Sequence, residues 1–186
     1  MKAHRVMAVV AALALLPALA PAATARPPRQ DPSVARGYYV ITDPTSALFL
    51  SVKSEQVRDR VTVLLANTVP LDYRLWHVDC PPQLGCAVRN AHTGTYLAVT
   101  GLPRDGLPVV TRVSPYRWDI TQAWSAEQGA YHISRFTSQV EYRVARSAAE
   151  VLPPLVEVWR ADGSAAAQQW KLTLVRDRAG RTAAGG

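Results

Sequence analysis

The sequence predicts an all-β fold, and three observations support this prediction. Between residues 37 and 175, apolar and polar residues alternate with a period of two in short runs rich in Val, Ile, Tyr and Thr, which is typical of strands. Pro, Gly, Asp and Ser interrupt these runs often, as turn residues do. No stretch of about 12 residues keeps a helical period. We therefore expect many short strands joined by turns.

A tryptophan closes each of three similar segments of the chain. Trp76, Trp118 and Trp170 lie in "DYRLWHV", "PYRWDI" and "QQWKLTLV", where a polar pair precedes the ring and an apolar alternation surrounds it. We predict that the three side chains occupy equivalent places in the last strand of each segment. There they would pack into a shared core, because buried aromatic side chains dominate core energetics.

The same three segments also align at their first strands. The runs "GYYVI", "GCAVR" and "AYHIS" are in register on three apolar residues: Ile41, Val88 and Ile133. Nine positions later each segment has a residue of a second strand: Leu50, Leu97 and Tyr142. A valine-rich run and the tryptophan run follow, so each segment has about four strands. Three such repeats, at about 37–80, 83–126 and 129–175, match a β-trefoil with pseudo-three-fold symmetry, whereas a propeller typically needs four or more blades.

The first 25 residues are typical of a secretory signal peptide. Lys2 and Arg5 precede an uncharged apolar run over 6–20, which is too short to span a bilayer, since that takes roughly 20 apolar residues. An A-x-A cleavage site ends at Ala25, and a second candidate ends at Ala22. We therefore predict a secreted protein without a membrane span.

The basic charge lies mainly at the two ends of the mature chain. The formal net charge is +7, and residues 26–36 and 176–186 each contain three arginines and one aspartate. Their charge and low complexity predict a disordered leader and a disordered tail. A nucleic-acid-binding domain needs its basic patch on the folded surface. We therefore do not expect nucleic-acid binding.

Cys80 and Cys86 are the only cysteines. An even count in a secreted chain predicts a disulfide, and the enclosed "PPQLG" has the composition of a turn. Closing so small a loop stabilises the fold by about 2 kcal/mol in the chain-entropy model. No further ligands have the spacing of a metal site, so we expect neither a metal nor a cofactor.

Catalytic motifs are absent from the sequence. The mature chain has three histidines without metal-ligand spacing: His77, His92 and His132. It has no G-x-S-x-G elbow and no phosphate-binding glycine loop. Isolated acids such as Asp119, Glu127, Glu141 and Glu157 carry no mark of a paired glycosidase site. We predict that the protein is not an enzyme.

Binding is the better class of function. Trp124 and Trp159 stand outside the three-fold tryptophan pattern. An exposed tryptophan can stack on a sugar ring or anchor a protein partner, although a lid over the barrel mouth is the alternative role. We expect a monomer that binds a glycan or a protein.

The repeats resemble the ricin-B-type β-trefoils, especially the secreted fungal lectins. Those proteins carry Q-x-W near each repeat end and commonly S/T-G-x-x-L near each start. Gln168 and Trp170 match the first motif, and "HTGTYLAV" at 92–99 is similar to the second. Arg74 and Tyr116 replace the glutamine in the other two repeats. The resemblance covers about residues 37–175 and implies a carbohydrate-binding module.

The resemblance also implies where a sugar would bind. In sugar-binding members an aromatic residue about 11 or 12 positions before the Q-x-W tryptophan stacks on the ring, and Trp159 stands 11 before Trp170. The places of the usual sugar-binding aspartate hold other residues: Ser51, Ala98 and Arg143. The third repeat is therefore the candidate site, with a different set of polar groups: Arg143, Glu141 and Gln168. Trp124 is a further candidate contact.

Two alternatives use the same fold. Plant Kunitz-type and mushroom serine-protease inhibitors offer an exposed loop to a peptidase, and arginine on such a loop suits trypsin-like enzymes. The loops "GLPRDG", with Arg104, and "EQVRDR", with Arg58, are the candidates. A module that docks another protein is the third possibility.

Overall fold

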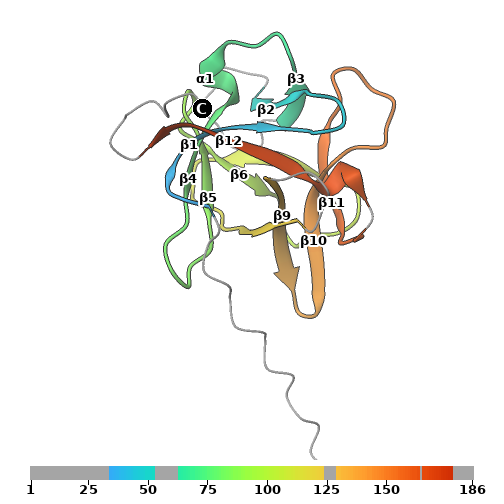
Figure 1. Ribbon diagram of the computed structural model, residues 1–186. Helices are drawn as coiled ribbons and strands as arrows, with labels where there is room; N and C mark the ends of the chain where they lie inside the picture. The colour runs from blue at the N-terminus through green and yellow to red at the C-terminus, as the bar shows by residue number, and fades with distance from the viewer. Residues whose placement is uncertain (1–33, 53–62, 124–128, 164, 178–186) are drawn as a thin grey trace, which may run out of the picture.

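The structure is a computed structural model that describes residues 34–52, 63–123, 129–163 and 165–177. Within these residues the chain is all-β, as the sequence predicts, with a 12-stranded sheet and two short helical turns (Figure 1). The elements are β1 (Gly37–Thr42), β2 (Phe49–Val52), β3 (Val63–Ala66), α1 (Leu71–Arg74), β4 (Leu75–Asp79), β5 (Ala87–Asn90), β6 (Tyr96–Val99), β7 (Leu107–Arg112), β8 (Asp119–Gln122), β9 (Ala130–Thr137), β10 (Val140–Arg146), β11 (Val156–Arg160), η1 (Ala166–Gln168) and β12 (Trp170–Asp177).

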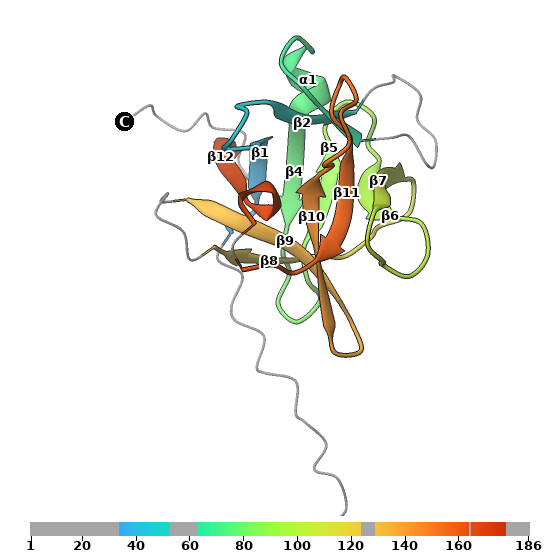
Figure 2. The ribbon, with the colours of Figure 1, turned by 90° about the vertical axis from the view of Figure 1, so that its right-hand side faces the viewer.

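Six strands close into a barrel through antiparallel pairing. β1 pairs with β4 and β12, β4 pairs with β5, and β9 pairs with β8 and β12. Cys86 and Trp118, just before β5 and β8, form the bridge that completes the ring. The other six strands form the hairpins β2–β3, β6–β7 and β10–β11. Figure 2 shows β10 and β11 side by side, with β7 and β6 to their right. Each of the three predicted segments contains four consecutive strands.

The three recurring tryptophans lie in the core. Trp76, Trp118 and Trp170 are fully buried. Each indole Nε1 donates a hydrogen bond to a carbonyl oxygen of the second strand of its own segment, at 2.8–2.9 Å: Leu50, Leu97 and Val144. Because a buried indole N–H needs an acceptor, these bonds fix the ring orientation as well as its burial. Each tryptophan thus joins the last strand of its segment to the second.

The second strand of the third segment lies two positions later than the sequence spacing predicts. Residues next to the aligned apolar positions pair across the hairpins as follows: Thr42 with Phe49, Arg89 with Tyr96, and Ser134 with Arg143. Val144, and not Tyr142, therefore corresponds to Leu50 and Leu97. The prediction for Tyr142 is wrong because β9 and β10 continue pairing to Thr137 and Val140 before the chain turns.

Different turn chemistry explains this difference in length. In the first segment the Asp43 carboxylate accepts hydrogen bonds from Thr45 N at 2.9 Å and Ser46 Oγ at 2.6 Å. In the second segment Asn90 Oδ1 accepts from His92 N at 3.1 Å and Thr93 N at 3.0 Å. Such side-chain bonds to nearby backbone end the first strand and start the turn. Arg135 holds the corresponding place in the third segment, so β9 continues through it.

Residues next to both ends of the predicted domain take part in the described fold. Val34 packs in the core, Ala35 O accepts a hydrogen bond from Tyr39 Oη at 2.7 Å, and Arg36 pairs with Asp79 at 3.4 Å. At the other end β12 continues to Asp177, which pairs with Gly37. Residues 34–36 and 176–177 are therefore part of the described fold, because these short stretches have the apolar and pairing groups to join the barrel.

The predicted disulfide is confirmed. Cys80 and Cys86 are bonded, and the bond closes the loop between β4 and β5. Arg117 Nη1 donates to Gly85 O in this loop at 3.3 Å. The bridge therefore lies next to Trp118 and braces the barrel where β5 and β8 meet. In the part of the chain that the structure describes, no helix is long and apolar enough to cross a membrane.

Candidate functional site

The candidate site predicted for the third segment is an outward face of β9, β10 and β11. Arg143 pairs with Ser134 on one side and with Trp159 on the other, so these residues share a face of the sheet. Because side chains two apart on a strand point the same way, this face carries five functional side chains. We call it the β10 face: His132, Glu141, Arg143, Glu157 and Trp159.

Arg143 is held at the centre of the β10 face. Its Nε lies 2.9 Å from Glu141 Oε1 and its Nη2 lies 3.2 Å from Glu141 Oε2, a two-pronged ion pair. Both side chains are mostly buried, at 13% and 22% exposed. Nη1 lies 3.3 Å from His132 Nε2. Because arginine only donates, His132 Nε2 acts as the acceptor in this contact.

Burial and the neighbouring charges of the β10 face favour the neutral form of His132. Burial is the largest cause of the lowered pKa of His132, and the Arg143 charge lowers this pKa further, while Glu141 opposes both. A neutral imidazole matches the acceptor role of its Nε2. The face therefore carries one cation and two carboxylates in an ordered arrangement.

Trp159 is the exposed aromatic of the β10 face. Its side chain is 38% exposed, and Nε1 donates to Glu157 Oε2 at 3.1 Å. The ring lies against Gly106, where an added Cβ would stand 3.7 Å from Trp159 Cζ2. The indole thus packs against Gly106 on one side and leaves part of its surface accessible to solvent. An aromatic ring fixed in this way can stack on the apolar face of a sugar.

The loop before β7 braces the strand that carries Trp159. Asp105 Oδ1 accepts from Arg160 N at 2.7 Å, and Asp105 Oδ2 pairs with Arg160 Nε at 3.3 Å. Gly106 N donates to Val158 O at 3.0 Å. The residues on both sides of Trp159 are therefore tied to the neighbouring loop, which limits movement of the ring.

Gln168 lies behind this region and does not reach the β10 face as a ligand contact. It is buried, its Oε1 accepts from Asp162 N at 2.9 Å, and its Nε2 donates to Arg160 O at 2.8 Å. Both ends of the amide are therefore used to hold the chain that follows Trp159. The structure assigns Gln168 a supporting position, because the glutamine of Q-x-W points into the fold.

The corrected register also moves the place of the usual sugar-binding aspartate. In the third segment that place belongs to Ala145, whereas Arg143 corresponds to Phe49 and Tyr96. The three aspartate places now hold small buried side chains: Ser51, Ala98 and Ala145. A sugar bound at the β10 face would therefore depend on other polar groups.

The remaining predicted residues divide between the described and the undescribed parts of the chain. Arg104 is exposed in the loop between β6 and β7. Trp124 and Arg58 lie outside the described residues, as do residues 1–33 and 178–186. Among the described residues no group of three or more His, Cys, Asp or Glu side chains could hold a metal ion.

The sequence did not single out two members of the β10 face. His132 and Glu157 look like an ordinary strand histidine and an isolated acid. Only the pairing of three strands brings them beside Arg143 and Trp159. With the correct register for the third hairpin, the sequence would have indicated that these side chains lie on one face.

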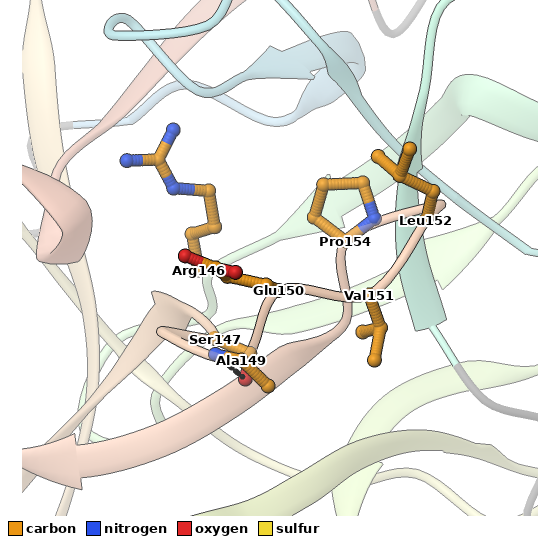
Figure 3. Close-up of a pocket in the computed structure, with 7 residues that line it drawn as sticks. All are labelled: Arg146, Ser147, Ala149, Glu150, Val151, Leu152 and Pro154. Carbon is orange, nitrogen blue, oxygen red and sulfur yellow. Dashed lines mark hydrogen bonds between the residues drawn. The ribbon is translucent and has the colours of Figure 1, made fainter.

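A separate hollow of about 400 Å³ lies at the loop between β10 and β11 (Figure 3). Its lining comes from one stretch of chain: Arg146, Ser147, Ala149, Glu150, Val151, Leu152 and Pro154. Arg146 Nη1 pairs with the buried Asp43 Oδ2 at 3.0 Å, so this cation anchors the loop to the first turn. The hollow therefore presents mainly the side chains of a single loop.

Solved structures with the same fold include two fungal lectins. The ricin B-like lectin of Macrolepiota procera, solved in complex with lactose, is 21% identical, with a TM-score of 0.61 over 76% of this chain and 97% of that one. The Rhizoctonia solani agglutinin is 14% identical, with a TM-score of 0.65 over 76% of this chain and 97% of that one. The designed three-fold symmetric protein ThreeFoil is 18% identical, with a TM-score of 0.62 over 74% of this chain and 98% of that one.

These likenesses show that the chain has the fold of the ricin-B-type β-trefoils. No family model matches the sequence, and no curated protein is significantly similar to it.

Proposed function

We propose that the protein is a secreted, non-catalytic β-trefoil of three four-stranded repeats that binds carbohydrate through the β10 face. The observation that carries this proposal is Trp159, an exposed indole held between Gly106 and Glu157. The lectins of the same fold support it at the level of the fold.

The three segments differ at the place of this indole. Trp159 pairs with Arg143, and at the corresponding places of the first two segments Ala66 pairs with Phe49 and Arg112 pairs with Tyr96. Only the third segment presents an aromatic side chain there. One binding site per chain is therefore the expected stoichiometry.

The polar groups of the β10 face suit sugar hydroxyls. Glu157 accepts one bond from the indole, and a carboxylate has further lone pairs for a hydroxyl. Next to it, Arg143 is fixed by Glu141, so binding does not have to order its long side chain. Opposite charges in the face favour a neutral hexose over a strongly anionic one.

The test is a glycan array on the mature chain from Arg26, followed by calorimetry with the strongest glycan and with lactose. We expect Trp159→Ala to weaken binding by about 1 to 3 kcal/mol, which is the cost of leaving partner groups unpaired and of losing the stacked ring. Trp159→Phe should retain part of the affinity. Leu84→Ala, at a residue 60% exposed in the disulfide loop, is the matched control and should change nothing. A blank array, or equal loss in both alanine variants, would contradict the proposal.

Peptidase inhibition is the second candidate, favoured by the loop around Arg104. Arg104 is exposed, while the flanking Pro103 is buried and Asp105 is tied to Arg160. An exposed arginine on a braced loop is the geometry that a trypsin-like pocket accepts. Stoichiometric inhibition of trypsin that disappears in Arg104→Ala, with glycan binding intact, would favour this function. Absence of inhibition at equimolar protein would exclude it for trypsin.

A further inference from the structure

A row of cationic and aromatic side chains crosses the sheet away from the β10 face. Strand pairing places Tyr38 opposite His77, His77 opposite Arg89, Arg89 opposite Tyr96, and Tyr96 opposite Arg112. The row thus runs across five strands, from β1 through β4, β5 and β6 to β7. Neighbouring strands lie about 4.8 Å apart, so the row is about 19 Å long. We call it the arginine row.

The side chains of the arginine row face outward. Arg89 is exposed, and the other four are partly exposed, while the residues next to them along each strand, such as Tyr39, Val78 and Val88, are buried in the core. The row is therefore a surface feature to which five strands each contribute one side chain.

The charge of the arginine row is positive. Arg89 and Arg112 make no ion pair with an acid in the described part of the chain, and Arg36 adds a third guanidinium beside Asp79. Burial lowers the pKa of His77, and the charges of Arg36 and Arg89 lower it further, while Asp79 opposes them. The imidazole therefore senses a net positive field at this point of the row.

The aromatic rings of the row are not open stacking platforms. Tyr38 and His77 pack against each other with ring centroids 4.9 Å apart. The Arg89 guanidinium lies over the Tyr96 ring, 5.9 Å from its centroid, and Arg89 Nε donates to Gly94 O at 2.7 Å. Single-stranded nucleic acids rely on open ring faces for base stacking. The row offers guanidinium donors and positive charge instead, which suit sulfate or carboxylate groups on a linear chain.

We propose that the arginine row is a second binding surface, separate from the β10 face, for a linear anionic polysaccharide that carries sulfate or carboxylate groups. Arg89 and Arg112 stand two strands apart, about 10 Å, and would each take an anionic group of the same chain. This inference does not depend on the proposed sugar site at Trp159.

The test measures binding of a size-defined heparin hexasaccharide to the mature chain by calorimetry at about 50 and about 200 mM salt. We expect Arg89→Gln with Arg112→Gln to weaken binding roughly tenfold and to flatten the salt dependence by about two ion equivalents. Arg104→Gln with Lys171→Gln removes the same charge elsewhere and should change affinity less than about twofold. Arg112→Gln alone should give part of the loss, and it leaves the Arg89 contact to the turn intact.

The pKa of His77, followed by NMR, adds a local readout. Bound anions should raise this pKa in the native chain, because they offset the fields of Arg36 and Arg89. No binding of the hexasaccharide would overturn the proposal. Equal losses in the two double variants would also overturn it, because they would indicate attraction to overall charge or to the basic ends. Tighter binding of oligo-dT than of the hexasaccharide, lost in the Arg89 and Arg112 variants, would replace the polysaccharide by a nucleic acid.

Discussion

In all three segments a turn connects the first strand to the second. Side chains close this turn in the first two segments but not in the third. Asp43 and Asn90 bind the backbone just beyond them and close short turns. The third segment has Arg135 at this place, and β9 and β10 run on to Thr137 and Val140. A turn that is closed by side-chain hydrogen bonds fixes the length of the hairpin. A hairpin whose turn lacks such bonds can continue pairing for more residues.

The extension is where the third segment acquires its site. Arg143 corresponds to Phe49 and Tyr96 of the other hairpins, but Glu141 lies in the added part of β10 and has no counterpart there. Glu141 holds the Arg143 guanidinium with both carboxylate oxygens. The longer hairpin therefore turns a position that is aromatic in the first two segments into an ordered polar centre beside Trp159.

The largest effect should come from breaking a closed turn. Asn90 is buried, accepts from His92 N and Thr93 N, and donates through Nδ2 to Tyr73 O at 2.9 Å. Asn90→Ala should lower the free energy of unfolding by about 3 kcal/mol, because several buried backbone groups lose their partner. Arg135→Ala, at the corresponding place, should cost about 1 kcal/mol or less, since one bond to Arg117 O at 3.2 Å is lost. Urea denaturation of both variants checks this, and equal costs would contradict the contrast between the turns.

A smaller effect is expected at the turn position with a positive φ. Two substitutions there should change the free energy of unfolding in opposite directions. Ala47 has φ 56° and Gly94 has φ 70° at corresponding places. A residue with a Cβ is disfavoured in this conformation. Ala47→Gly should therefore stabilise the fold by up to about 1 kcal/mol, and Gly94→Ala should destabilise it by about 1 kcal/mol or more, since the new Cβ would also stand 2.7 Å from Arg89 Nη2. Thermal denaturation would detect both changes. A stabilising Gly94→Ala would show that the strain argument is wrong.

The smallest effect concerns pH. The folded-state pKa of His132 lies below its usual value near 6.5, mainly through burial and then through Arg143. Below pH 6.5 the unfolded chain therefore binds a proton that the folded chain does not, and stability falls as the pH decreases toward the folded pKa. His132→Gln should reduce this loss between the two pKa values. His77→Gln should do likewise, because the pKa of His77 is also lowered. Unfolding curves at a series of pH values measure this dependence of stability on pH. If His132→Gln has the same dependence as the native chain, the titration of His132 is not its cause.

Much of the fold could be predicted because the tryptophans and the strand alternation carry it. Trp76, Trp118 and Trp170 mark the ends of the three segments whatever the turns between them do. The register of the third hairpin could not be predicted, since spacing alone cannot distinguish an extended hairpin from a short one. The residues "SALFL" at 46–50 correspond to "TGTYL" at 93–97, with Ala47 in the glycine place. The third segment has no such match. This difference was the signal in the sequence that the third hairpin has another length.

The candidate site could be predicted only in part. The resemblance to the ricin-B-type trefoils pointed to Trp159, through its spacing from Trp170. The sequence could not show that Gln168 turns inward and bonds to Asp162 N and Arg160 O. The Q-x-W motif is the same whether its glutamine points inward or toward a ligand. Nor could the sequence bring His132 to Arg143, since that contact requires the pairing of β9 with β10.

The most direct test of a single site in the third segment is an indole ¹H–¹⁵N titration of the mature chain with the glycan that gives the strongest array signal. We expect the Trp159 signal to shift on binding with the affinity measured by calorimetry. The signals of the buried Trp76, Trp118 and Trp170 should stay in place, because their N–H groups already bond to carbonyls in the core. An unmoved Trp159 signal at saturating glycan would contradict the account.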